Sequence, residues 1–318
     1  MNLIRRLLMK LSGLKFTQDY LCIDKQTFEP TLRVYLTNQG VIVNEITTTH
    51  TFVGYSPLIF GIPYYSSPTA EIIFSQKLLF PNERFGKKDA VASLKMEKIH
   101  ELSADGRKVG FYLGKKGRHS LLPGLNQSAI SLHDKLYNRK PGNVFLPGNL
   151  LSQVHIAYAV PRTISLITLK EGENFNLFPT DLHGPVGESH YLISLRHAGK
   201  ACAQVIRQQR ILLSEMNPAM YRQVYSLGRN HMQDPKPREN FPFGREISKA
   251  FGLPVPDGMA RYRELALEER FEYGIHRIML FRVENSFAGE ESHTLTHVHN
   301  VYATWRHKQG QAGNYLLR

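Results

Sequence analysis

The sequence of 318 residues has only two cysteines, Cys22 and Cys202, and they do not form a C-x-x-C pair. Two isolated cysteines argue against a disulfide framework and against a cysteine-based zinc site, and they are typical of a reducing compartment. No apolar run reaches the roughly 18–20 residues that a membrane-spanning helix needs. We therefore expect a cytoplasmic protein with no membrane span.

Several catalytic signatures are also missing from the sequence. It has no G-x-x-x-x-G-K-[ST] loop, no G-x-G-x-x-G after a strand, no H-E-x-x-H and no G-x-S-x-G. The sequence therefore gives no support to four enzyme classes: P-loop nucleotide hydrolases, dinucleotide-fold dehydrogenases, zinc proteases and serine hydrolases. His293, His297 and His299 lie in one expected strand, but no acidic residue or cysteine accompanies them at ligand spacing, so we expect no metal site.

Acidic residues are scarce relative to basic ones. There are 27 Asp and Glu against 40 Lys and Arg, which gives a net charge of +13. Such an excess favours either a basic solvated surface or an anionic partner. The basic residues are spread along the chain and form no long run or known nucleic-acid motif, so nucleic acid is the less favoured partner.

The first fourteen residues are amphipathic. Their apolar side chains follow helical spacing, whereas Arg5, Arg6 and Lys10 lie off that face. Lys10 interrupts the apolar centre that a signal peptide requires. We expect a helix that packs on its own domain, and the alternative is a helix lying in a membrane interface.

The first half of the chain is rich in strand signals. Residues 31–36, 40–51 and 57–62 are expected strands, and Asp105-Gly106 joins a hairpin of residues 94–102 and 108–113. Ser67-Pro68-Thr69 predicts a helix start, with Ser67 as cap and Pro68 in the first turn.

The second half repeats this plan. Strands are expected at 164–167 and 191–195, and helices at Lys200–Leu213 and Arg245–Phe251. Two further strands are expected at residues 275–283 and 293–305. Turn residues cluster at 138–149, which predicts a boundary between a domain of residues 1–140 and one of residues 150–318.

One constant offset of 132 residues relates the two halves without a gap. It places Thr31 on Thr163, Leu32 on Ile164, Gly40 on Gly172, Asn44 on Asn176, Thr48 on Thr180 and Ser67 on Gly199. A shared offset for six pairs indicates an internal duplication, which decides the architecture.

Three segments of the second half carry a family resemblance: residues 176–181, Ser194-Leu195-Arg196 followed by residues 197–201, and Gly274-Ile275-His276. In this order and spacing, residues of about 150–310 resemble the flavin reductase family. The resemblance implies an FMN-binding split barrel. The expected fold class is therefore mainly β, with two tandem split-barrel-like domains, each a Greek-key antiparallel barrel, and a few short helices.

The resemblance also implies a function and a site. It implies a flavoprotein that binds FMN or FAD and acts as an NAD(P)H-dependent oxidoreductase on a flavin or a small molecule. Members of the family are commonly dimers with the flavin near the subunit interface, so this chain is expected to be a monomeric pseudo-dimer or a homodimer. The implied cofactor-binding residues are Asn176, Leu177, Phe178, Pro179, Thr180, Asp181, Ser194, Leu195, Arg196, His197, Gly199, Lys200, Ala201 and His276.

These residues suit a flavin phosphate. A helix N-terminus has unpaired N–H groups and a partial positive charge, and Arg196 and Lys200 add charge-assisted donors beside it. One departure leaves alternatives open, because the hydroxyl-bearing Ser-x-Thr turn of the family reads Gly199-Lys200-Ala201 here. The first half instead has Ser67-Pro68-Thr69 and an Asn-x-x-Thr at residues 44–47. Either half could hold the flavin, and the alternative function is a non-enzymatic barrel that binds an anionic partner such as nucleic acid.

Overall fold

The computed structural model describes residues 3–15, 20–24, 32–86, 88–137, 144–290, 293–311 and 316–317. For residues 20–23 and 316–317 it describes the backbone alone. Thr31, Lys87 and the turn-rich residues 138–143, at the expected domain boundary, lie outside the described residues.

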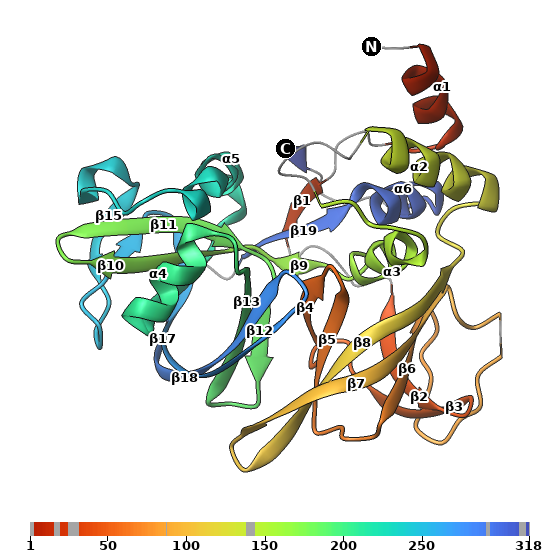
Figure 1. Ribbon diagram of the computed structural model, residues 1–318, viewed down its shortest axis with the longest axis horizontal. Helices are drawn as coiled ribbons and strands as arrows, with labels where there is room; N and C mark the ends of the chain where they lie inside the picture. The colour runs from red at the N-terminus through yellow and green to blue at the C-terminus, as the bar shows by residue number, and fades with distance from the viewer. Residues whose placement is uncertain are drawn as a thin grey trace.

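Two seven-stranded antiparallel sheets form the frame of the described chain (Figure 1). The first has the strand order β3-β2-β6-β7-β8-β5-β4. Its strands are β2 (Arg33–Asn38), β3 (Val41–Glu45), β4 (Thr51–Tyr55), β5 (Leu58–Pro63), β6 (Thr69–Ser75), β7 (Ala92–Ala104) and β8 (Arg107–His119).

The second sheet has the order β11-β10-β14-β17-β18-β13-β12. Its strands are β10 (Ser165–Glu171), β11 (Asn174–Thr180), β12 (His183–Val186), β13 (His190–Arg196), β14 (Arg210–Met216), β17 (Met259–Tyr273) and β18 (His276–Ala288). In both sheets every neighbouring pair is antiparallel. The mainly β, split-barrel-like fold class predicted from the sequence is confirmed.

The two sheets correspond strand by strand. Moving along the chain by 132 residues carries the first residues of β2, β4 and β5 onto the first residues of β10, β12 and β13. The remaining strands occupy the same places in the two orders, with β6, β7 and β8 matching β14, β17 and β18. The expected hairpin at Asp105-Gly106 is also present, and both residues have positive φ, as such a turn requires.

The predicted helix start at Ser67-Pro68-Thr69 is wrong. Thr69 is instead the first residue of β6, which pairs with β2 and β7. Ile72, Ile73 and Phe74 of β6 are fully buried, so the burial of a β-branched segment outweighs the local cap signal. In the second half a helix, α4 (Lys200–Gln208), stands at the corresponding point of the chain.

Three other boundaries differ from expectation. The helix predicted at Lys200–Leu213 ends at Gln208, because Gln209 adopts a left-handed conformation and β14 follows. Residues Arg245–Phe251 contain part of the short strand β15 (Phe243–Ile247), which pairs with β16 (Pro254–Pro256), and no helix. The strand predicted at residues 293–305 is β19 (Leu295–His299) followed by α6 (Asn300–Lys308), whose buried Val301, Tyr302 and Trp305 need a helical face.

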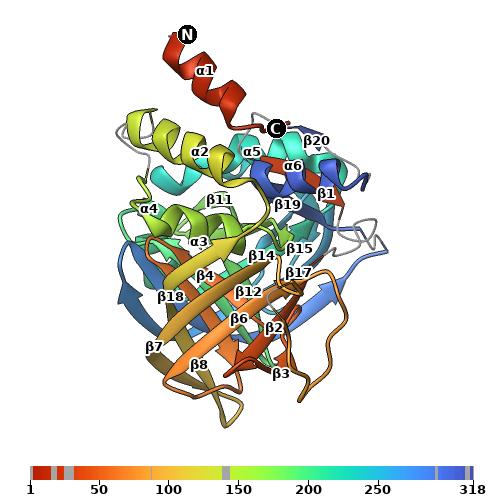
Figure 2. The ribbon, with the colours of Figure 1, turned by 90° about the vertical axis from the view of Figure 1, so that its right-hand side faces the viewer.

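Further helices gather at one end of the first sheet (Figure 2). They are α1 (Leu3–Leu11), α2 (Gly124–Tyr137), α3 (Asn149–Ala157) and α6. The core of the first sheet includes side chains of α3 and α6, such as Ile156 and Tyr302. A short helix α5 (Tyr221–Ser226) and three 3-10 turns, η1 (Pro218–Met220), η2 (Leu227–Met232) and η3 (Arg238–Asn240), lie beside the second sheet.

A four-stranded sheet joins distant parts of the chain. Its order is β20-β1-β19-β9, with β1 at Tyr20–Asp24, β9 at Arg162–Thr163 and β20 at Leu316–Leu317. A strand from the beginning of the chain therefore pairs with strands that belong to the second half.

The two large sheets pack against each other through matching turns. The β17–β18 turn lies against the β4–β5 turn, where Ile275 N donates to Ser56 O over 3.2 Å. Reciprocally, the β7–β8 turn lies against the β12–β13 turn, where Ser189 Oγ donates to Asp105. Between these contacts, one hydrophobic cluster combines residues of both halves, among them Ile59, Phe111, Leu192 and Leu280. The halves are thus related by an approximate two-fold arrangement.

Candidate functional site

A cavity of about 340 Å³ lies where the second sheet, the start of α4 and the first half of the chain meet. Its volume falls within the range of small-molecule and cofactor sites. The residues that line it are Tyr55, Phe178, Pro179, Thr180, Asp181, Leu182, Ser194, Leu195, Arg196, Ala198, Gly199, Ala201, Cys202, His231, Met232 and His276.

Ten of the fourteen residues predicted for the site line this cavity. They are Phe178, Pro179, Thr180, Asp181, Ser194, Leu195, Arg196, Gly199, Ala201 and His276. They come from the end of β11, the end of β13, the start of α4 and the start of β18. The three sequence segments that carry the family resemblance therefore meet at one place.

The other four predicted residues do not line the cavity. Asn176 is buried and donates from Nδ2 to Gln204 Oε1 over 2.7 Å, which ties β11 to α4. Leu177 is a core residue. His197 is exposed, with Nε2 3.2 Å from Gly274 O, and Lys200 Nζ forms an exposed ion pair with Asp234 Oδ2 at 2.6 Å.

The start of α4 forms one side of the cavity. Gly199 is its N-cap residue, and no side chain caps the helix. A Cβ at this position would lie 3.2 Å from Arg196 O and 3.4 Å from His231 O, so only glycine fits without displacing the backbone. The uncapped N–H groups and the nearby guanidinium of Arg196 make this side of the cavity electropositive and suited to an anion.

Tyr55 reaches the cavity from β4 in the first half. Burial raises the pKa of its phenol, although the positive charge and hydrogen bond of Arg196 oppose this shift. The phenol therefore stays protonated at neutral pH. The Arg196 guanidinium of the second half therefore interacts with a side chain from the first half.

His276 lines the cavity and is fully buried. The backbone N–H of Tyr55 donates to its Nε2 over 3.2 Å, and Ser194 Oγ lies 3.4 Å from its Nδ1. Because a backbone N–H can only donate, Nε2 is the acceptor, and the proton of the neutral ring is on Nδ1. Burial, with help from the charge of Arg196, lowers the pKa of His276 to about 4.

Asp181 is the carboxylate of the site. Its Oδ2 lies 2.9 Å from Arg162 Nη1 and 2.8 Å from His297 Nε2. Burial acts to raise the pKa of Asp181, but the charges of Arg162 and His297 outweigh it and hold the pKa below its ordinary value. Arg162 is itself held by the ring of Tyr158, whose centroid is 3.7 Å from the guanidinium carbon. This network anchors the end of β11 and keeps a negative charge at the cavity wall.

Six lining residues were not among the predicted cofactor-binding residues: Tyr55, Leu182, Ala198, Cys202, His231 and Met232. Leu182, Ala198 and Cys202 are chain neighbours of predicted residues. His231 and Met232 come from η2, a segment without a recognisable motif. The duplication implied a contribution from the first half but carried no signal that named Tyr55. Burial raises the pKa of the Cys202 thiol, so it is a poor nucleophile.

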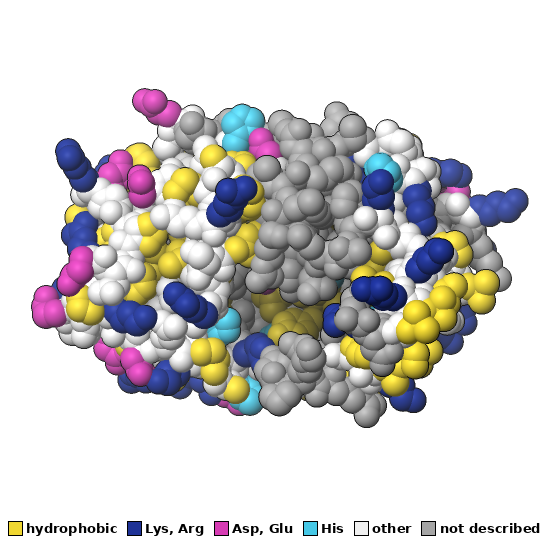
Figure 3. Space-filling view, turned by 90° about the horizontal axis from the view of Figure 1, so that it is seen from above, with side chains coloured by type: hydrophobic (Ala, Val, Ile, Leu, Met, Phe, Trp, Pro, Cys, Tyr) yellow, Lys and Arg dark blue, Asp and Glu magenta, His cyan; other side chains and the backbone are white. Residues whose placement is uncertain are grey.

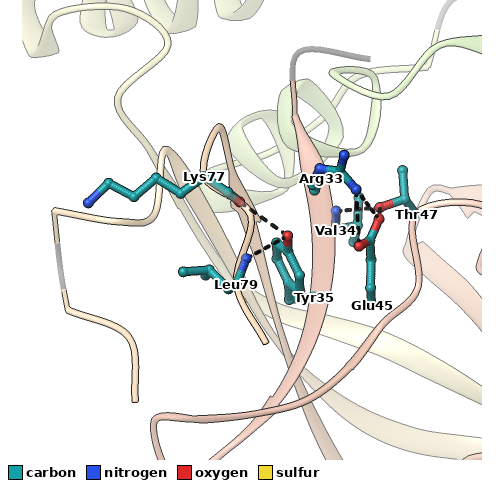
Figure 4. A network of polar contacts seen from close by, with 7 residues as sticks. All are labelled: Arg33, Val34, Tyr35, Glu45, Thr47, Lys77 and Leu79. Atoms are coloured by element: carbon teal, nitrogen blue, oxygen red, sulfur yellow. Dashed lines mark hydrogen bonds and ion pairs between the residues drawn. The ribbon is translucent and has the colours of Figure 1, made fainter. Parts of the chain in front are cut away.

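The Asn-x-x-Thr segment of the first half has a structural role (Figure 4). Thr47 Oγ1 accepts a hydrogen bond from Val34 N over 2.9 Å and donates to Glu45 Oε1, also over 2.9 Å. Glu45 in turn pairs with Arg33. The hydroxyl that matched the family pattern thus bonds within its own sheet, and Ser67 lies two residues before the first residue of β6.

Metal and membrane signals are absent from the described parts of the chain. Among the residues described, there is no group of three His, Cys, Asp or Glu side chains that could hold a metal ion. None of the described helices has the length and apolar character needed to cross a bilayer.

Comparisons with known proteins agree with the observed architecture. No family model and no curated protein matches the sequence. An NADH:FAD oxidoreductase of Streptomyces globisporus is 13% identical, with a TM-score of 0.43 over 51% of this chain and 96% of that one. The solved structures that this chain resembles in fold are flavin reductases and FMN-binding proteins.

Two other solved structures are similar in the same way. An FMN-binding protein of Thermus thermophilus is 17% identical, with a TM-score of 0.36 over 41% of this chain and 73% of that one. The styrene monooxygenase flavin reductase of Pseudomonas putida is 14% identical, with a TM-score of 0.38 over 45% of this chain and 90% of that one. At these identities the similarity concerns the fold alone.

Proposed function

We propose that this chain binds FMN in the cavity between its halves and acts as an NAD(P)H-dependent oxidoreductase on a flavin or a small molecule. The observation that carries the proposal is the cavity itself, which joins the uncapped start of α4 and Arg196 to a buried wall. An uncapped helix start with an adjacent cation suits a phosphate. The wall includes Phe178 and Leu182 for an apolar ring, and Thr180 and Ser194 for polar contacts at its edge.

The residues present fit FMN better than a simple anion. Gly199 lets the backbone approach a phosphate closely, and the hydroxyls absent from the Gly199-Lys200-Ala201 turn are replaced by the guanidinium of Arg196. FAD carries the same first phosphate and would use the same residues. When bound, the flavin supplies the hydride chemistry, and the protein supplies binding, orientation and electrostatics.

In this proposal each wall residue has a defined task. Arg196 and the first N–H groups of α4 hold the phosphate. His276, neutral at physiological pH and protonated on Nδ1, presents an uncharged ring to the flavin or to its reaction partner. Asp181 keeps its charge and orients polar atoms at the cavity wall. A nicotinamide would have to approach the flavin through the same cavity.

We further propose that the active form is a monomer that imitates a dimer. Support comes from the reciprocal turns between the halves, the shared hydrophobic cluster and the contribution of Tyr55 to a site built mainly by the second half. Light scattering on the purified protein measures the mass, and a value of one chain supports the pseudo-dimer.

The decisive test is a titration of the purified protein with FMN and with riboflavin, followed by flavin fluorescence. We expect one FMN per chain, bound about ten- to a hundredfold more tightly than riboflavin because only FMN offers a charged group to Arg196 and α4. Oxidation of NADH or NADPH with added FMN then tests the enzymatic part. A protein that is colourless and leaves FMN fluorescence unchanged contradicts the proposal. Salt-sensitive binding of an oligonucleotide would then favour the non-enzymatic alternative.

A further inference from the structure

Helices α1 and α2 form an antiparallel pair on the outside of the molecule. Near one end of the pair, the Arg5 guanidinium lies over the ring of Tyr137 at 5.6 Å. Near the other end, Asn126 Nδ2 donates to Leu11 O over 2.8 Å. Past α1, Lys15 N donates to Thr304 Oγ1 of α6 over 3.1 Å, so the pair is fixed to the rest of the fold.

This helix pair leaves large apolar side chains in solvent. In α1, Leu8 is buried, but Leu3, Leu7 and Leu11 on the neighbouring helical positions are 80%, 55% and 53% exposed. In α2, Leu125, Leu132 and Leu136 follow one helical face and are 88%, 46% and 52% exposed. These six leucines are called the leucine patch below. Figure 3 shows hydrophobic side chains gathered on this side of the molecule, with Lys and Arg side chains around them.

The exposed charge on the helix pair that carries the leucine patch has one sign. Residues 3–15 contain no acidic residue, and the only one in α2, Asp134, is buried. The exposed charged side chains of these two segments are all basic: Arg5, Arg6, Lys10, Lys15 and Lys135. Apolar side chains bordered by Arg and Lys are the signature of helices that lie in a membrane interface.

We propose that the leucine patch and its basic border attach the protein peripherally to an anionic membrane surface. The leucines enter the boundary between headgroups and acyl chains, and the five basic side chains contact anionic headgroups. A second copy of the chain is a poorer occupant, because pairing two such surfaces brings basic side chains together without a counter-charge. The cavity lies at the junction of the two halves, so membrane attachment and flavin binding use different residues.

Flotation of the full-length protein with lipid vesicles tests the proposal. We expect binding to vesicles of phosphatidylcholine mixed with phosphatidylglycerol that is at least about tenfold stronger than to phosphatidylcholine alone, and weaker in high salt. The double variant Leu3→Gln/Leu7→Gln keeps the helix propensity and the charge, and it should bind about tenfold more weakly. The double variant Arg6→Glu/Lys10→Glu should lose the preference for anionic vesicles.

Leu78→Gln/Phe80→Gln is the matched control, because these side chains are 54% and 61% exposed in the loop between β6 and β7. It should bind vesicles like the original protein, and all variants should bind FMN alike. The proposal is overturned if the original protein does not float with anionic vesicles, or if patch and control variants bind equally. It is also overturned if the Leu3→Gln/Leu7→Gln change converts a dimer to a monomer and leaves vesicle binding unchanged. In that case a second copy of the chain covers the leucine patch.

Discussion

The two halves of this chain share the order of all seven strands. They differ in the segment that leads into β6 in the first half and into β14 in the second. In the first half residues 64–68 lead from β5 directly into β6, whereas in the second half residues 197–209 insert α4 between β13 and β14. The described cavity lies at the start of α4, and none of its lining residues comes from the start of β6. The sheet therefore provides a frame, and the inserted helix adds the uncapped helix start at which we propose that the phosphate binds.

Single residues sharpen the same contrast. The offset of 132 places Arg196 on Tyr64 and Gly187 on Tyr55. The guanidinium carbon of Arg107 lies 4.9 Å from the centroid of the Tyr64 ring. Tyr64 is uncharged, so this position of the first half lacks the positive charge that Arg196 has in the second. Tyr55 of the first half therefore contributes a side chain to the cavity of the second half. At the corresponding position of the second half, Gly187 has no side chain to contribute. This asymmetry is why we expect one flavin per chain.

The largest effect is expected from the paired turns that join the halves. Gly274 has φ +59, and a Cβ there would collide with Pro57 and lie 2.5 Å from Ser56 O. Gly106, in the matching turn of the first half, has φ +68, but a Cβ there would meet no atom within 4 Å. Gly274→Ala should lower the free energy of unfolding by about 3–5 kcal/mol and Gly106→Ala by about 1 kcal/mol. Denaturant unfolding measures both, and equal losses would contradict the packing of the halves.

The next effect concerns pH and the buried imidazole of the second half. His276 has a folded pKa of about 4, below the ordinary value of a histidine. Between about pH 6.5 and pH 4 the unfolded chain takes up a proton that the folded chain excludes, so the free energy of unfolding falls as the pH falls. The contribution of this residue is about 3 kcal/mol over that window.

His276→Gln should remove this part of the pH dependence, because a glutamine oxygen can still accept from Tyr55 N. The exposed His197→Gln is the matched control, and the change of slope caused by His276→Gln should exceed the change that it causes. Unfolding curves at several pH values give the answer. If both variants keep the slope of the original protein, the buried neutral state assigned to His276 is wrong.

A smaller effect separates the two cations at α4. Arg196→Gln should weaken FMN binding by about 1.5–3 kcal/mol and leave riboflavin binding almost unchanged, since riboflavin lacks the phosphate. Lys200→Ala should change neither, because Lys200 pairs with Asp234 on the exposed side of the helix. Fluorescence titration compares the four affinities. If Lys200→Ala weakened FMN binding and Arg196→Gln did not, the phosphate would bind outside the cavity.

The smallest effect tests the Asn-x-x-Thr segment of the first half. Thr47→Ala removes the acceptor of Val34 N and should cost about 1 kcal/mol of stability. FMN affinity should not change, because Thr47 is engaged within its own sheet. Denaturant unfolding and FMN titration of one sample measure both quantities. If Thr47→Ala lowered the FMN affinity without lowering the stability, the FMN site would lie in the first half.

Much of the fold could be predicted from the sequence because its signals are local. Alternating and β-branched segments marked most strands, Asp105-Gly106 marked a hairpin, and the constant offset marked the relation between the halves. The errors have a common physical cause. At Ser67-Pro68-Thr69 and at residues 300–305, a local propensity or pattern was overruled by burial in a sheet or against a core.

The site was predictable only in part. The motifs identified ten lining residues because those residues lie next to one another in sequence at the ends of β11 and β13 and at the start of α4. Lys200 and His197 have the right chemistry at the right spacing, but the direction of a side chain at a helix start depends on its neighbours in space. No local pattern in the chain distinguishes them from Arg196.

Local sequence patterns were sufficient for the mainly β class, the internal correspondence of the halves and the segments that carry the site. Such properties follow from side-chain periodicity and turn chemistry, which act over a few residues. Tertiary packing was needed to bring Tyr55 into the cavity, to place α4 in one half alone and to hold Asp181 between Arg162 and His297. Each of these three features depends on contacts between segments that are distant in the chain. The free energy of such a contact depends on both segments, so no local pattern in either one predicts it.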